Sequence, residues 1–233
     1  MKLSEFSLAS SICPFCGRTL MLRLNAESSG LRCIRCAASE VHLALGQVLR
    51  DKVADMSQMD VCELSASGPY VKYIEGNARR VSLSEFSEAV EPGQTVNGVR
   101  CEDVQCLTYP NECFDLVTHT EVLEHVPDDG AAFAELRRVL KVGGMMMFTV
   151  PMSGQTKTIE RARGVGPDIE YLLEPVYHTD PWQRGAGILA YRDYGTDIIA
   201  KLDAAGFERV EIIKPKALAP WYESHEVILA RRS

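Results

Sequence analysis

The sequence predicts an α/β fold in which a twisted, mostly parallel sheet carries helices on both faces. The first indication is a β-α-β unit at residues 114–151, FDLVTHTEVLEHVPDDGAAFAELRRVLKVGGMMMFTVP. It reads as an apolar strand, an amphipathic helix and a continuously apolar strand of the kind covered on both faces. The second indication is an acid at or just past the end of each of three earlier predicted strands. Ligand sites of open α/β sheets lie at such strand ends.

Composition limits the class of protein. The 233 residues, 46% of them hydrophobic, suffice for one large domain or a medium domain with a small appendage. The apolar residues are too evenly spread for a membrane span, and residues 1–16 lack the apolar run of a secretion signal. We therefore expect a cytoplasmic protein without a membrane partner. A net charge of −7 disfavours a nucleic-acid partner without excluding one, and the oligomeric state stays open.

Residues 1–39 form a separate unit with two C-x-x-C pairs, made by Cys13, Cys16, Cys33 and Cys36. Each pair can present two thiolates from a tight turn, and four thiolates supply the tetrahedral shell that zinc prefers. We predict a zinc ribbon with a short hairpin around residues 28–30. The metal is expected to be structural, because a four-thiolate shell is closed. Four unrelated reduced cysteines and a redox dithiol pair are the alternatives.

An amphipathic helix at residues 40–57 is expected to link the ribbon to a main domain at residues 58–233. That domain opens with a strand at residues 59–64, followed by a turn of small residues and a short helix that has Pro69 in its first turn. Small residues there let the backbone approach a ligand closely. Further strands are predicted at residues 81–83 and 99–102.

The second half of the domain begins with the β-α-β unit. Asp128 or Asp129 can cap its helix, and Gly143 and Gly144 are predicted to end it. A long insertion follows, which we interpret as a lid or binding surface because of its length and its many aromatic and arginine side chains, Trp182 among them. The insertion spans residues 152–194. After it, a helix is predicted at residues 196–205 and strands at 210–213 and 227–230.

Five segments of the main domain carry a family resemblance: CELSASGP, CEDVQCLTYPNECFDLV, TEVLEHVPD, ELRRVLKVGGMMMFTVP and LDAAGFERVEII. From about Asp60 the chain resembles class I S-adenosylmethionine-dependent methyltransferases. The resemblance implies a Rossmann-like, seven-stranded, mostly parallel sheet and S-adenosylmethionine as cofactor. It assigns the methionine part to Glu63 and the turn Ser65, Ala66, Ser67 and Gly68, the ribose to Glu85, the adenine to Asp103 and Val104, and the sulfonium end to His119 and Thr120.

The first turn departs from the family pattern. The family has acid-x-Gly-x-Gly, whereas this chain has Glu63-Leu64-Ser65-Ala66-Ser67-Gly68. Serine resists positive φ and crowds a ligand at close range, although its hydroxyl can donate a hydrogen bond. A methyltransferase-like fold that has lost its cofactor is the alternative.

Acids and imidazoles gather after the central strand. Glu121, Glu124 and His125 stand at i, i+3 and i+4, so on a helical turn they share one face. Such a set suits general-base catalysis or a divalent metal. In small-RNA 3′-end and ubiquinone-pathway O-methyltransferases a similar Glu-x-x-Glu-His supplies metal ligands, and the resemblance implies His178 as a fourth. We prefer a structural or substrate-gating role for the set over this second metal. For a hydroxyl acceptor the candidate bases are His119, His125 and His178.

The favoured function is methyl transfer to oxygen or nitrogen of a small polar metabolite or glycan precursor. One alternative is an RNA methyltransferase guided by the ribbon, whose basic residues are Arg18, Arg23, Arg32 and Arg35. The other is a non-catalytic binding or scaffold protein on the same fold, since fold does not fix function.

Overall fold

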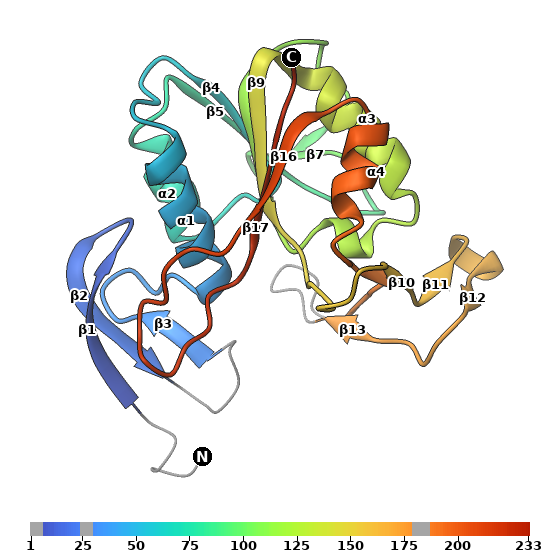
Figure 1. The fold of residues 1–233 in the computed structure, drawn as a ribbon. Helices are drawn as coiled ribbons and strands as arrows, with labels where there is room; N and C mark the ends of the chain where they lie inside the picture. The colour runs from blue at the N-terminus through green and yellow to red at the C-terminus, as the bar shows by residue number, and fades with distance from the viewer. Residues whose placement is uncertain (1–6, 24–29, 179–186) are drawn as a thin grey trace.

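The structure is a computed structural model and describes residues 7–23, 30–178 and 187–233. Its centre is a sheet of eight strands in the order β16-β17-β9-β8-β4-β5-β7-β6 (Figure 1). The four contacts that join β9, β8, β4, β5 and β7 are parallel, while β17 runs antiparallel to both of its neighbours. The strands are β4 (Asp60–Glu63), β5 (Arg80–Glu85), β6 (Thr95–Val96), β7 (Val99–Cys101), β8 (Phe114–Thr120), β9 (Leu140–Thr149), β16 (Glu208–Ile213) and β17 (Val227–Arg231). The predicted mostly parallel sheet is confirmed, with the two-residue β6 added at its edge.

Helices cover both faces of the sheet, as predicted (Figure 1). They are α1 (Glu40–Lys52), α2 (Pro69–Glu75), α3 (Asp129–Val139) and α4 (Ile198–Ala204). On one face Leu45 and Ile74 pack against Met147 of β9, and on the other Phe133 packs against Phe148. Neighbouring residues of β9 thus serve opposite cores, which explains why this strand is apolar throughout. Among the described residues, no helix is long and apolar enough to cross a membrane.

Two predicted boundaries are wrong. The linking helix ends at Lys52, not at residue 57, and α3 ends at Val139, before the two glycines that we expected to stop it. Gly143 and Gly144 lie inside β9, where the pairing with β8 shifts register. Gly143 has φ +82°, and a Cβ on Gly144 would lie 3.2 Å from the Asp115 carbonyl oxygen. The two glycines therefore allow the irregular backbone of β9 at this register shift. Asp128 caps α3, as one of the two predicted candidates, by accepting from the Ala131 N–H.

The N-terminal unit is an antiparallel sheet of β1 (Ser7–Cys13), β2 (Gly17–Arg23) and β3 (Leu31–Cys33). Residues 28 and 29 of the predicted hairpin lie outside the described residues. The unit shares a core with α1 and with the segment between β16 and β17: Met21 and Leu43 pack with Ala219 and Tyr222. This contact with residues far along the chain was not predicted. It fixes the ribbon beside the main sheet.

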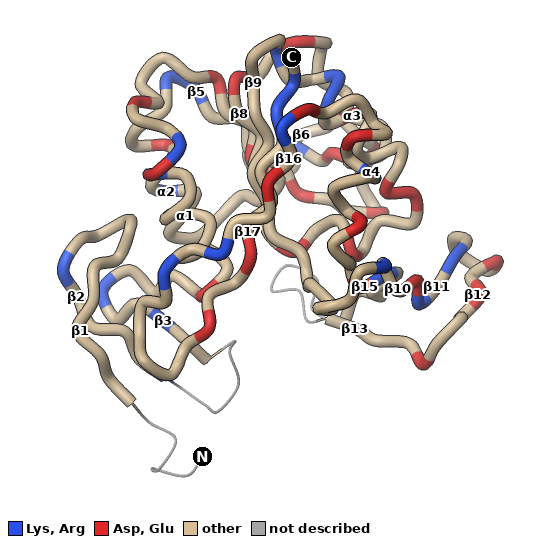
Figure 2. Tube along the Cα trace, viewed as in Figure 1, with Lys and Arg blue, Asp and Glu red and all other residues tan. Residues whose placement is uncertain are grey.

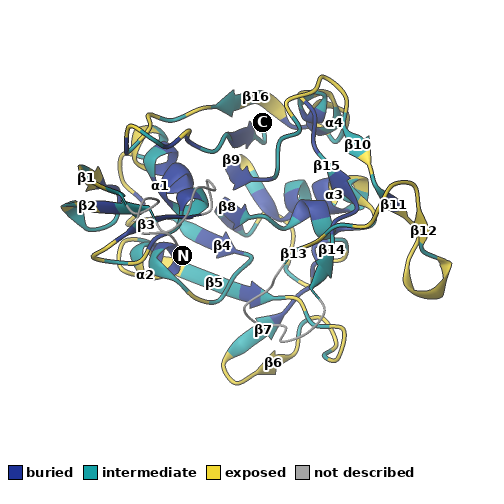
Figure 3. Cartoon of the chain, turned by 90° about the horizontal axis from the view of Figure 1, so that it is seen from below, coloured by how far each residue is buried: buried dark blue, intermediate teal, exposed yellow. Residues whose placement is uncertain are grey.

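The insertion is built from three short antiparallel pairs, β10 with β15, β11 with β12 and β13 with β14. The strands are β10 (Ile159–Glu160), β11 (Ala162–Arg163), β12 (Glu170–Tyr171), β13 (Tyr177–His178), β14 (Ile188–Leu189) and β15 (Arg192–Asp193). Trp182 lies outside the described residues. Seen from below in Figure 3, β11 and β12 project from the molecule; both residues of β12 are exposed, whereas in β11 Ala162 is buried. Strand β15 is next to the buried core.

Candidate active site

The candidate site lies where the parallel strands β4, β5, β7 and β8 end. In Figure 1 this is the lower end of the sheet, with the ribbon on one side and the insertion on the other. Acids stand at or near these ends, as predicted, in the form of Glu63, Glu85 and Asp103. The geometry thus brings the residues of the predicted cofactor crevice and the acid–imidazole cluster to one edge of the sheet.

Glu63 is almost fully buried, at 1% exposed. Its carboxylate accepts hydrogen bonds from the Ser65 hydroxyl at 2.7 Å and from the Thr118 hydroxyl. Burial raises the pKa of Glu63 to about 8, and the two hydroxyl donors only partly offset that effect. The cost of burying this acid implies a specific role for it at the end of β4.

The turn at residues 65–68 does not need the glycine that the family pattern leads one to expect. Among its four residues only Gly68 has positive φ, at +107°, and there glycine is present. The Ser65 hydroxyl points back to Glu63, and the Ala66 N–H donates to Glu85 at 2.8 Å. The conformational objection to the serines therefore does not apply. The turn links the acids of β4 and β5 directly.

The remaining predicted cofactor residues lie along the same edge. Asp103 accepts from the Gln105 backbone N–H at 2.9 Å, and Val104 is 7% exposed against the core. Thr120 ends β8 opposite Thr149 of β9. His119 is fully buried and stacks on the Phe148 ring at 4.7 Å. Burial lowers the pKa of His119 to about 3, so its imidazole is neutral, and neither nitrogen has a hydrogen-bond partner among the described residues.

The prediction that Glu121, Glu124 and His125 share one helical turn is wrong for Glu121. Only Leu123–His125 form a helical turn, the 3-10 helix η3, and Glu121 precedes it with a positive φ of 53°. Positive φ strains a residue that has a side chain and is common at functional sites. Burial and the nearby charge of Glu124 raise the pKa of Glu121 to about 8. Glu121 is separate from the compact group that the structure forms beside it.

That group consists of Glu124, His125 and His178, whose ligand atoms lie within 4.8 Å of one another. Glu124 Oε1 is 3.6 Å from His125 Nε2 and 3.7 Å from His178 Nδ1. Glu124 is fully buried, and neither carboxylate oxygen has a hydrogen-bond donor among the described residues. Glu124 raises the pKa of His178 above its usual range. The structure thus unites three of the four predicted residues.

His125 has a defined tautomer when it is neutral. Its Nδ1 lies 2.8 Å from the carbonyl oxygen of Leu189, and a carbonyl oxygen can only accept. The proton therefore sits on Nδ1, which leaves Nε2 as the basic atom facing Glu124. This makes Nε2 suitable for accepting a proton or for binding a metal.

The residue that joins the insertion to this cluster is Arg192, one of the arginines for which the sequence suggested contact with substrate and not a structural role. Arg192 is 3% exposed, and its guanidinium donates to the carbonyl oxygens of Leu123, Val126 and Pro127. The Tyr191 N–H also donates to the Glu124 carbonyl oxygen, at 2.7 Å. A buried arginine in an apolar stretch, ILAYRDY, was the available signal.

The four cysteines predicted to bind metal come together. Cys13 Sγ lies 3.6 Å from Cys36 Sγ, Cys16 Sγ lies 3.5 Å from Cys33 Sγ, and all four sulfurs lie within 4.8 Å of one another. Tetrahedral zinc with Zn–S bonds of about 2.3 Å separates its sulfurs by about 3.8 Å, so the cluster fits this metal. No sulfur pair is bonded as a disulfide.

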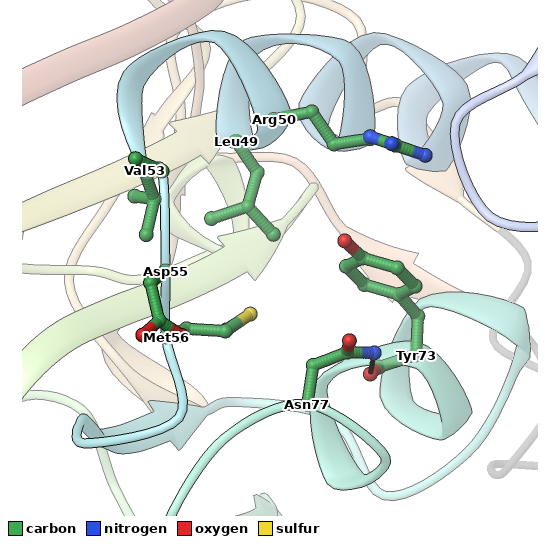
Figure 4. Close-up of a pocket in the computed structure, with 8 residues that line it drawn as sticks. Leu49, Arg50, Val53, Asp55, Met56, Tyr73 and Asn77 are labelled. Atoms are coloured by element: carbon green, nitrogen blue, oxygen red, sulfur yellow. Dashed lines mark hydrogen bonds between the residues drawn. The ribbon is translucent and has the colours of Figure 1, made fainter.

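A cavity of about 100 Å³ lies elsewhere, between α1 and α2 (Figure 4). It is lined by Leu49, Arg50, Val53, Ala54, Asp55, Met56, Tyr73 and Asn77. None of these is at the carboxyl ends of the parallel strands, so the cavity is separate from the candidate site.

Comparisons with known proteins agree with this geometry. A family model described as a methyltransferase domain matches residues 16–148. A solved S-adenosylmethionine-dependent methyltransferase from Mesorhizobium loti superposes with a TM-score of 0.52 at 19% identity, over 79% of this chain and 96% of that one. A second such structure, from Listeria monocytogenes, gives a TM-score of 0.51 at 16% identity, over 80% and 95% of the two chains.

A curated relative matches a short segment. It is a ubiquinone biosynthesis O-methyltransferase of Coxiella burnetii, 36% identical over 50 residues. The match spans 22% of this chain and 21% of the relative, so it carries no conclusion about the whole protein. The family model covers more than half of the chain, and the solved structures share its fold. The chain therefore belongs to the methyltransferase domain family.

Proposed function

We propose that this enzyme transfers a methyl group to oxygen or nitrogen of a small polar metabolite or glycan precursor. The observation that carries the proposal is the meeting of His178, from the insertion, with Glu124 and His125 beyond the end of β8. Insertions that supply a polar group to a strand-end site commonly shape substrate binding. The local match to a ubiquinone biosynthesis O-methyltransferase favours oxygen as the acceptor atom.

The chain's own residues fit the cofactor. We propose that Glu63 and the turn at residues 65–68 hold its methionine part, Glu85 the ribose hydroxyls, and Asp103 with Val104 the adenine. Both side-chain donors to Glu63, the hydroxyls of Ser65 and Thr118, are uncharged, so this acid suits the ammonium of an amino acid. When bound, the cofactor supplies an electrophilic methyl group. His119 and Thr120 border the sulfonium end, and His119 is neutral there, so it adds no competing positive charge.

On the acceptor side we propose His125 as the general base. A hydroxyl acceptor must lose its proton as the methyl group arrives, and Nε2 of His125 is the free basic atom. Glu124 supports the imidazolium that then forms, at 3.6 Å from that nitrogen. His178 orients the acceptor from the insertion, and alignment of the two reactants supplies much of the rate.

A screen of metabolite pools with a labelled methyl donor tests this function. Transfer of label to a small molecule is expected, and it should fall by about 100-fold or more in His125→Gln, since general-base catalysis contributes roughly 10²–10⁴-fold. Cys106→Ser, at an exposed cysteine, is the matched control and should transfer label normally. A His125→Gln variant with normal turnover excludes His125 as the base.

A second proposal concerns metals. We infer a structural zinc ion on the four cysteines, and a divalent cation on Glu124, His125 and His178 as the competing role of that cluster. The orphaned oxygens of Glu124 favour the cation, because a buried carboxylate without donors is costly. A bound cation would polarise an acceptor oxygen. Calorimetric titration with Mg²⁺, Mn²⁺ and Zn²⁺ should show a site that Glu124→Gln removes; the same titration curve in both proteins excludes it.

The ribbon gives weak support to the alternative RNA acceptor. Its described residues carry four arginines and no acid (Figure 2). However, Arg32 pairs with Glu40 at 3.0 Å and Arg35 donates to the Cys16 carbonyl oxygen, so at least two of the four serve the protein itself. RNA binding that falls steeply with salt would favour that acceptor.

A further inference from the structure

His42 belongs to helix α1 but faces the cofactor turn. Its imidazole Cε1 lies 4.0 Å from the position of a Cβ atom built on Gly68, the last residue of the turn. This histidine precedes the first strand of the main sheet, and no motif in the sequence marks it. The candidate site therefore extends to the N-terminal part of the chain.

The orientation of the ring is set by a neighbour. Ser39 precedes the first turn of α1, and its hydroxyl lies 2.8 Å from His42 Nδ1. Burial and the charge of Arg32 lower the pKa of His42 to about 4, so the ring is neutral at physiological pH. When Nδ1 accepts the Ser39 proton, the ring proton is on Nε2. His42 then offers one uncharged N–H donor.

The ribbon holds the beginning of α1 in place. Arg32 of β3 forms an ion pair with buried Glu40 at 3.0 Å and pairs through the backbone with Ser39. From the other side the Tyr222 hydroxyl donates to the Glu40 carbonyl oxygen at 3.5 Å. Helix α1 also contacts β8, the strand that leads into the candidate site. The His42 ring therefore lies on the first turn of α1, which contacts with the ribbon and with Tyr222 hold in place.

We propose that His42 is a cofactor-binding residue that donates from Nε2 to the carboxylate of the methionine part at the 65–68 turn. This inference rests on the proposed assignment of that turn to the cofactor. The methionine part carries an ammonium and a carboxylate, and Glu63 suits only the first. A neutral donor beside Gly68 satisfies the second without leaving a buried charge when the cofactor is absent.

Two substitutions of His42 separate the donor from the bulk of the ring. Glutamine places a donor near the position of Nε2, whereas asparagine reaches only the position of Nδ1. Titration calorimetry with S-adenosylhomocysteine reads binding without turnover. His42→Asn should bind about tenfold or more weakly, as expected for a lost hydrogen bond to a charged group, and His42→Gln should stay within about threefold of the original.

Controls make the outcomes distinct. Zinc content and the thermal midpoint report whether the ribbon and α1 remain folded. Lys52→Ala, at the far end of α1 in an exposed pair with Glu211, should bind normally. Normal affinity in a folded His42→Asn overturns the inference, and so does equal weakening of both variants. Failure of the unsubstituted enzyme to bind S-adenosylhomocysteine would instead contradict the assignment of the cofactor crevice.

Discussion

The four-cysteine cluster and the Glu124 cluster are both able to hold a metal, but they are assembled differently. The cysteines come from two tight turns of one small unit, with two of the four sulfur-bearing residues buried and no coordination position left for substrate. The Glu124 cluster joins η3 to the insertion, and His178 is partly exposed. The four-cysteine cluster therefore resembles a closed structural metal site, whereas the cluster of Glu124, His125 and His178 is open to a ligand.

The two clusters take their structural support from different parts of the molecule. The cysteines depend on their own spacing and on the core that the ribbon shares with α1 and residues 218–222. The Glu124 cluster depends on Arg192, which ties the insertion to the carbonyls around η3. Substitutions in the two supports should therefore differ in their effects.

Removal of a zinc ligand should have the largest effect. Cys33→Ser takes one thiolate from a buried position, and structural zinc in small units contributes on the order of 10 kcal/mol to folding. We expect loss of bound zinc and of the folded ribbon, measured by metal analysis and thermal unfolding. Cys106→Ser, at an exposed cysteine, should keep one zinc per chain. Retention of that zinc by Cys33→Ser would exclude the four-sulfur site.

Arg192→Met should have the next largest effect. It removes a guanidinium donor from each of three carbonyl groups and the buried cation from Glu160 and Asp129, which costs about 3 kcal/mol or more. Urea unfolding measures this loss. Arg163→Met, in an exposed pair with Glu170, is the matched control and should change stability by less than about 1 kcal/mol. Equal losses in the two variants would show that Arg192 does not brace the insertion.

Gly46→Ala tests how closely the ribbon packs on α1. A Cβ there would lie 2.4 Å from the Phe15 ring, which packs against the rings of Tyr70 and Tyr73. Overpacking of this kind costs about 1–3 kcal/mol, so we expect a lower thermal midpoint with zinc still bound. Gly76→Ala, where the nearest atom is 3.4 Å away, should be close to neutral. An unchanged midpoint in the first variant would mean that the contact between ribbon and helix is loose.

Much of the fold was accessible from the sequence because its signals are local. The β-α-β unit, the cap at Asp128 and the paired cysteines each follow from spacing within a few residues. The glycines at 143 and 144 were misread, since a helix stop and a strand irregularity use the same residue type.

The site was accessible only in part. Strand-end acids are local in sequence, but the approach of His42 to Gly68, and of Arg192 to the loop around η3, depends on how distant segments dock. The packing of such distant segments depends on shape and burial summed over many residues, so no short sequence pattern predicts it.

The smallest expected effect is the pH dependence of stability from the pair of His178 and Glu124. The carboxylates of Glu124, Glu121 and Asp193 raise the pKa of His178, and the His125 ring packs against it edge-on. Because the folded pKa exceeds the unfolded value of about 6.5, the stabilisation is complete below that pH and disappears as pH rises through the folded pKa.

The stabilisation from this pair should stay below about 1 kcal/mol, since a side chain that is 36% exposed is screened by water. Comparison of urea unfolding for the original chain and His178→Gln across this range measures it. The gap between the two proteins should narrow as pH increases, and a gap that widens would place His178 outside the field of Glu124. The four-cysteine cluster shares no residue with this pair, so zinc content should stay constant across the same experiment.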